Sequence, residues 1–186
     1  MTNAKPKPAN QIGILGQLRS LRPNRPLRID EELAVAELQG TQLRYELTPT
    51  SQDRAFTLDD FDRHPKLAIT ADPDLPIETL SYWNGNRWTI ITQTNCGRRQ
   101  RRRLVLGEYY QIVNTPRHEH NDSPTTTQAR ERFVSAVLMP HNTVNRHWVQ
   151  HMSTVCQLAR RFDVTPQEMR DRLTAVGVIE PARSAA

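Results

Sequence analysis

Residues 118–122, HEHND, form the densest group of metal-binding side-chain types in the sequence. Alternating imidazole and carboxylate groups in a loop can chelate zinc, and Glu131 follows as a further oxygen donor. The segment is also very polar and lies between two prolines, which is typical of a surface loop whose histidines titrate at about pH 6.5. We favour the surface loop, and a zinc site built from His118, His120 and Glu131 is the alternative.

A second feature is strongly basic, because residues 98–103, RRQRRR, place five arginines in six positions. They are Arg98, Arg99, Arg101, Arg102 and Arg103. Such a run can bind the phosphates of a nucleic acid or the carboxylates of an acidic protein. No aromatic residue interrupts the run, so it offers no platform for stacked bases. The competing interpretation is a solvated loop whose charges repel one another.

Length and composition indicate one soluble domain. The chain has 186 residues, 37% of them hydrophobic, and a formal net charge of +5, which favours polyanionic partners. Its two cysteines, Cys96 and Cys156, have no paired spacing, and residues 1–11 lack the apolar core of a signal peptide. We therefore expect a cytoplasmic protein without membrane contact. It would have a disordered tail over 1–11, one domain over 12–179 and a flexible tail over 180–186.

The pattern of apolar residues predicts an α+β chain. Helices are expected over 12–23, 29–49 and 127–140, with Asp30 as the cap of the second, and a pair of helices is expected between 146 and 179. A strand is expected at 66–70 and a hairpin at 80–92, where Asn84-Gly85 suits a tight turn. Residues 104–113 are apolar and fit a helix or a strand equally well.

Four stretches, taken in order, resemble the ImmA/IrrE family of zinc-metallopeptidase-like proteins, in the form common in actinobacteria and their phages. They are RPLRIDEELAVAELQGTQL (25–43), LPIETLSYWNGNRWTIIT (75–92), RFVSAVLMP (132–140) and LARRFDVTPQEMRDRLTAVGVI (158–179). The third is close to the family's FAA-x-LLMP signature. The resemblance spans residues 12–179 and implies a zincin-like α+β fold, in which a small sheet with a hairpin packs on helices and a helix pair closes the chain.

In that family an arginine-containing lead-in precedes a helix with the motif HExxH, whose two histidines bind zinc and whose glutamate activates water. The corresponding residues here are Gly107, Glu108 and Gln111, so only the glutamate is kept. A third, acidic ligand is expected just before Phe133, and Glu131 lies close to that position but is displaced. A chain without both imidazoles should lose most of its affinity for zinc.

The resemblance therefore implies a pseudo-peptidase with Glu108 as a vestigial general base and no expected cofactor. We expect it to regulate by binding a helix-turn-helix repressor of a phage or mobile element. One alternative is an active zinc endopeptidase with a rearranged site that uses His118, His120 and Glu131. Another is a nucleic-acid-binding regulator that uses the arginine run. The closing helix pair looks like half of a helix-turn-helix unit, and we expect it to serve as scaffold.

Overall fold

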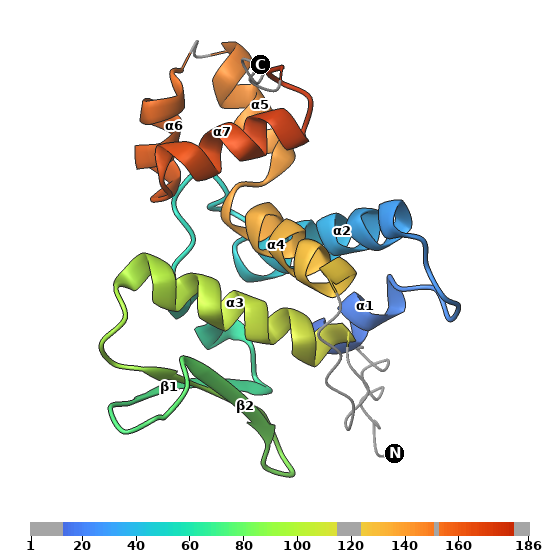
Figure 1. Ribbon diagram of the computed structural model, residues 1–186, viewed down its shortest axis with the longest axis vertical. Helices are drawn as coiled ribbons and strands as arrows, with labels where there is room; N and C mark the ends of the chain where they lie inside the picture. The colour runs from blue at the N-terminus through green and yellow to red at the C-terminus, as the bar shows by residue number, and fades with distance from the viewer. Residues whose placement is uncertain (1–12, 115–123, 151–152, 181–186) are drawn as a thin grey trace, which may run out of the picture.

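The computed structural model describes residues 13–114, 124–150 and 153–180, and in this part the chain is an α+β protein made mostly of helices (Figure 1). The helical elements are α1 (Ile14–Ser20), α2 (Ile29–Leu47), the 3-10 helix η1 (Leu58–Arg63), α3 (Arg98–Asn114), α4 (Pro124–Leu138), α5 (His141–Gln150), α6 (Val155–Phe162) and α7 (Pro166–Ala175). The strands are β1 (Leu67–Asp72), β2 (Thr79–Trp83) and β3 (Trp88–Gln93). The predicted tail over 1–11 and the loop with His118 and His120 lie outside the described residues.

The N-cap of helix α2 lies two residues earlier than the sequence predicts. Arg28 is its N-cap, and the Glu31 carboxylate accepts a hydrogen bond of 3.0 Å from the Arg28 backbone N–H. The prediction that Asp30 is the cap is wrong, because Asp30 lies inside the first turn. There its negative charge still faces the positive end of the helix dipole.

Helices α2 and α4 pack against each other very closely at Gly40. A Cβ at this position would lie 2.6 Å from the carbonyl oxygen of Phe133 and 2.8 Å from the Cβ of Ala136. Only glycine fits such an approach, because any side chain would meet the backbone of α4. Phe133 and Ala136, both from the RFVSAVLMP stretch, are fully buried at this crossing.

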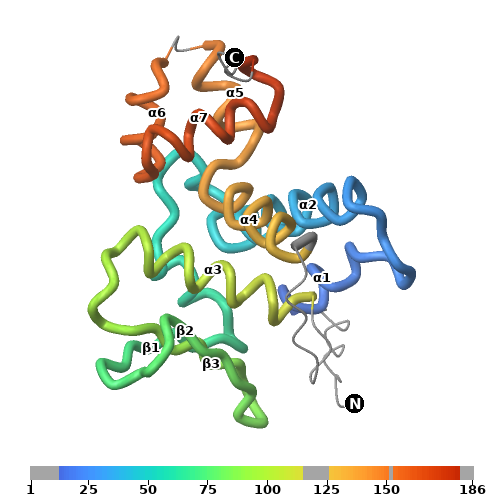
Figure 2. The backbone as a smooth tube through the Cα atoms, in the orientation of Figure 1, coloured from blue at the N-terminus to red at the C-terminus, as the bar shows by residue number. Residues whose placement is uncertain are grey.

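The three strands form a mixed sheet in the order β1-β3-β2, with β1 parallel and β2 antiparallel to β3 (Figure 2). One face of the sheet packs on α3, and Ile90 and Thr92 are fully buried there. Leu80 and Tyr82 point to the opposite face and are exposed. Strand β2 is therefore both an edge strand and the strand that lies beside the middle of α3.

The segment that periodicity left open, 104–113, is helical and belongs to α3. The arginine run forms the first turns of the same helix, so it is neither a loop nor a separate lead-in. Val105, Leu106, Tyr109 and Tyr110 are buried against the sheet and the neighbouring helices. A helix suits this segment because these four apolar side chains repeat at helical spacing.

Helices α5, α6 and α7 gather at the end of the molecule opposite the sheet (Figure 1). Thr165 caps α7 by accepting a hydrogen bond from the Glu168 backbone N–H. The buried Arg172 of α7 donates two hydrogen bonds to the Glu37 carboxylate of α2, at 2.6 and 2.7 Å. This ion pair fastens the closing helix pair to the central helices. No helix in the described part of the chain has the length and apolar character needed to cross a membrane.

Candidate functional site

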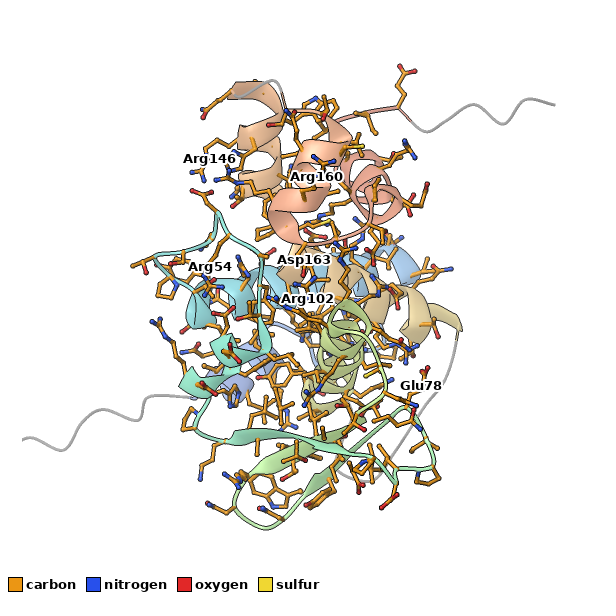
Figure 3. The ribbon with its side chains drawn as sticks, turned by 90° about the vertical axis from the view of Figure 1, so that its left-hand side faces the viewer. Arg54, Glu78, Arg102, Arg146, Arg160 and Asp163 are labelled. Carbon is orange, nitrogen blue, oxygen red and sulfur yellow. The ribbon has the colours of Figure 1, made fainter. Side chains whose placement is uncertain are left out.

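Gly107 and Glu108 line a charged cavity of about 540 Å³ between α3, β2, α4 and α7, and Gln111, the third residue compared with HExxH, is not among its lining residues. Gly107 forms part of its wall, and the charged residues that line it include Glu78, Arg103, Glu108, Arg130, Glu131 and Glu168. Figure 3 shows Glu78, which directly precedes β2. The structure thus brings Glu108 and Glu131, which are 23 positions apart in the sequence, to one cavity.

Glu108 projects from α3 toward the edge strand. Its carboxylate accepts a hydrogen bond of 2.8 Å from the Ser81 hydroxyl of β2. Among the described residues no cation forms an ion pair with it. Glu108 is therefore held by a neutral donor, and its hydrogen bond connects α3 to the strand beside it.

The side chain of Arg130 of α4 fills the space next to Gly107. A Cβ at Gly107 would lie 3.3 Å from Cδ and 3.8 Å from Cγ of Arg130, so the aliphatic part of the arginine packs on the glycine. In the part of the chain that the structure describes, the Arg130 guanidinium has no hydrogen bond or ion pair. A positive side chain thus lies against Gly107, the position that the sequence resemblance assigns to a first zinc ligand.

Glu131 is paired with another residue of the cavity. Arg103 forms ion pairs with Glu131 and with Glu168, the latter at 2.5 Å. Burial alone would raise the pKa of Glu168, but hydrogen bonds from Thr165 and the charge of Arg103 outweigh it, so its pKa lies below the ordinary value. One guanidinium therefore bridges a carboxylate of α4 and a carboxylate of α7.

These residues do not fit a zinc ion. Gly107 has no donor atom, and Arg130 beside it would repel a divalent cation. Glu131 would have to leave Arg103 before it could bind a metal. Within residues 13–114, 124–150 and 153–180, no group of three or more histidine, cysteine, aspartate or glutamate side chains comes together in metal-binding geometry. The two histidines of the alternative site, His118 and His120, lie outside the described residues.

The arginine run divides into two groups, and the side chains of the inner group bond to other parts of the protein. Arg102 is 2% exposed and donates to the Phe56 carbonyl at 2.7 Å, to the Asp163 carbonyl, and to the Asp163 carboxylate at 3.3 Å (Figure 3). Burial lowers its pKa, and the negative charge of Asp163 partly opposes that effect. Arg101 donates to the Thr92 hydroxyl of β3 at 2.9 Å. Together with Arg103 at the cavity, these residues join α3 to its neighbours.

The outer group, Arg98 and Arg99, is exposed at the start of α3. Arg99 pairs with the Asp163 carboxylate at 2.9 Å, and the Arg98 side chain has no hydrogen bond or ion pair to any described residue. Of the five arginines, only these two present most of their surface to solvent. The five arginines are close together in the sequence, but they have different surroundings in the fold.

Two residues that contact Gly107 or Glu108 have no signal in the sequence. Arg130 comes from a stretch that reads as an ordinary amphipathic helix, and Ser81 is one of several small polar residues in the hairpin. Neither belongs to a motif: Arg130 reaches the cavity, and Ser81 reaches the Glu108 carboxylate, each from an element distant in sequence. Arg130 could have been predicted only by knowing that α4 crosses α3 at Gly107.

No protein-family model and no curated protein matches the chain. Among solved structures, the chain is similar to a Mycobacterium tuberculosis transcriptional regulator, with a TM-score of 0.48 and 17% sequence identity. The similarity covers 91% of this chain and 53% of that protein, so the chain spans about half of the regulator's length.

Proposed function

We propose that the chain is a metal-free pseudo-peptidase of the ImmA/IrrE type with a zincin-like fold. It acts as a regulator by binding a helix-turn-helix repressor of a phage or mobile element without cutting it. The observation that carries the proposal is the packing of Arg130 on Gly107, because it puts a fixed positive charge where a peptidase of this family needs zinc. Without a metal, nothing lowers the pKa of the attacking water, so Glu108 has no nucleophile to activate.

The retained surface suits a peptide partner, since β2 offers an open edge. Hydrogen bonds run from the Gln93 N–H to the Glu78 carbonyl and from the Asn84 N–H to the Arg87 carbonyl. In an antiparallel ladder the bonded pairs alternate, so the backbone groups of Leu80 and Tyr82 point to β3 and those of Thr79 and Ser81 point outward. No hydrogen bond from a described residue reaches these outward groups.

An added strand would therefore pair with Thr79 and Ser81, directly beside the cavity. Its alternate side chains would point toward α3, where Glu108, Arg130 and Glu78 offer charges of both signs. This arrangement favours a peptide with polar or charged side chains at alternate positions. The resemblance supplies the class of partner, because active members of the family inactivate such repressors.

The metal part of the proposal is tested by metal analysis of chelator-stripped protein that is then offered zinc. We expect the wild type to retain no zinc, and the double variant G107H/Q111H to gain little because Arg130 still occupies the site. The triple variant G107H/Q111H/R130A should gain about one zinc per chain, since two imidazoles one helical turn apart share a face. About one zinc per chain in the wild type would refute the proposal.

The binding part is tested by calorimetry against purified helix-turn-helix repressors encoded by the same mobile element. Ser81→Pro removes an outward N–H without removing a ladder bond, so it should weaken binding about tenfold or more. Ser81→Ala is the matched control, because it also loses the bond to Glu108 but keeps the N–H. The repressor should remain uncut on a gel. Equal affinities for the two variants would refute strand addition at β2.

A further inference from the structure

We infer that a basic surface at the junction of α3 and α6 binds the phosphate backbone of duplex DNA. This inference is independent of the proposed peptide site, which lies at β2 and the middle of α3. It rests on a hollow, on side chains without an internal partner, and on a band of further arginines on the neighbouring helices.

The hollow has a volume of about 690 Å³ and is lined by Gly97, Arg98, Arg99, Gln100, Arg160 and Asp163. Its arginines come from two elements that are far apart in the sequence, the first turn of α3 and the last turn of α6. The one carboxylate, Asp163, is already paired with Arg99 and Arg102. Positive charge is therefore in excess at this place.

Two of the three arginines have no internal role. The side chains of Arg98 and Arg160 are exposed, and no described residue forms a hydrogen bond or ion pair with either. Five arginines occupy the first turns of α3 with no acidic residue among them, although the positive end of a helix dipole disfavours cations. An anion bound in the hollow would reduce the repulsion among these arginines and between them and the positive end of the helix dipole.

The band continues from the hollow across the C-terminal helices. Arg161 follows Arg160 in α6 and donates to the Asp53 carbonyl at 3.0 Å, and Arg146 of α5 pairs with the Asp53 carboxylate. Figure 3 shows Arg160 and Arg146 on the same side of the molecule, above Asp163. A band of positive charge that extends beyond one hollow fits a polymer with repeated negative charges better than a single small anion.

The chemistry of the hollow favours duplex over single-stranded nucleic acid. None of its lining residues is aromatic, so it cannot stack unpaired bases. Guanidinium groups instead bind phosphates, and phosphates are most dense along a duplex, at one negative charge per about 1.7 Å of helix axis. Contacts of this kind position a protein on DNA without reading its sequence.

The test is fluorescence anisotropy with the full chain and a labelled duplex of random sequence, about 20 base pairs long, over a range of salt concentrations. We expect R98Q/R160Q to weaken binding at low salt about tenfold or more and to reduce the salt slope by about 2, since each lost phosphate contact removes about 0.9. Neither side chain has a structural partner among the described residues, so the variant should fold normally, as circular dichroism would check.

The matched control is R63Q/R87Q, which removes the same charge from exposed positions in η1 and the hairpin. It should change affinity and slope much less. An equal loss in the control would show that only net charge matters and would overturn the inference. Absence of DNA binding at low salt would overturn it as well, as would binding of inorganic phosphate by calorimetry without binding of the duplex.

Discussion

Arg99 and Arg102 stand three positions apart in the arginine run and share one acceptor, Asp163, but their environments differ. The Arg102 side chain is 2% exposed and the Arg99 side chain is 53% exposed. We predict that Arg102→Met destabilises the protein strongly and that Arg99→Met has little effect. The comparison separates the internal part of the run from its solvent-facing part.

The magnitude follows from the bonds that each arginine makes. Arg102→Met removes donors to the Phe56 carbonyl and to the carbonyl and carboxylate of Asp163. Hydrogen bonds from a charged donor each contribute about 1.5–3 kcal/mol. Desolvation of the guanidinium and its unpartnered Nε offset part of this, so we expect a net loss of about 2–4 kcal/mol. The exposed ion pair of Arg99 should contribute under about 1 kcal/mol.

Urea unfolding followed by circular dichroism measures both free energies, and thermal melting gives an independent check. A loss of about 2–4 kcal/mol corresponds to a fall in Tm of roughly 5–15 °C for a chain of this size. Equal effects of the two substitutions would refute the reasoning. So would an Arg102→Met variant within about 0.5 kcal/mol of the wild type.

Three further predictions concern stability. Gly40→Ala should lower the free energy of unfolding by about 1–3 kcal/mol despite alanine's better helix propensity, because its Cβ would meet the Phe133 carbonyl; a stabilised variant in urea unfolding would contradict this. Burial lowers the pKa of His64 below its ordinary value of 6.5, so the unfolded chain takes up a proton more readily than the folded one. The free energy of unfolding should therefore fall as the pH drops below 6.5, and His64→Gln should flatten this dependence in parallel titrations. Thr165→Ala removes the cap of α7 and should cost about 1 kcal/mol, with a Thr165→Ser control near the wild type in thermal melts.

The regular elements were predictable because their signals are local. The apolar spacing of 29–49 and the hairpin around Asn84-Gly85 each depend on residues close together in the chain, and both elements are present. Residues 104–113 were ambiguous because a short apolar run suits either a helix or a strand. The helix is favoured because the segment packs on both the sheet and α4. The periodicity of the sequence carries no information about that packing.

The sequence alone determined that the helix with Glu108 lacks both histidines of a zinc motif, because ligand identity is a property of the residue. Only the tertiary structure decided which side chain lies beside Gly107. Arg130 reaches Gly107 because α4 crosses α3 there. Arg98 and Arg102 lie one turn apart on nearly the same face of α3, but Arg98 is at the exposed start of the helix and Arg102 meets Phe56 and Asp163. Charges that look alike in a linear run are distinguished by burial and by partners from distant segments, and those are fixed only when the helices pack.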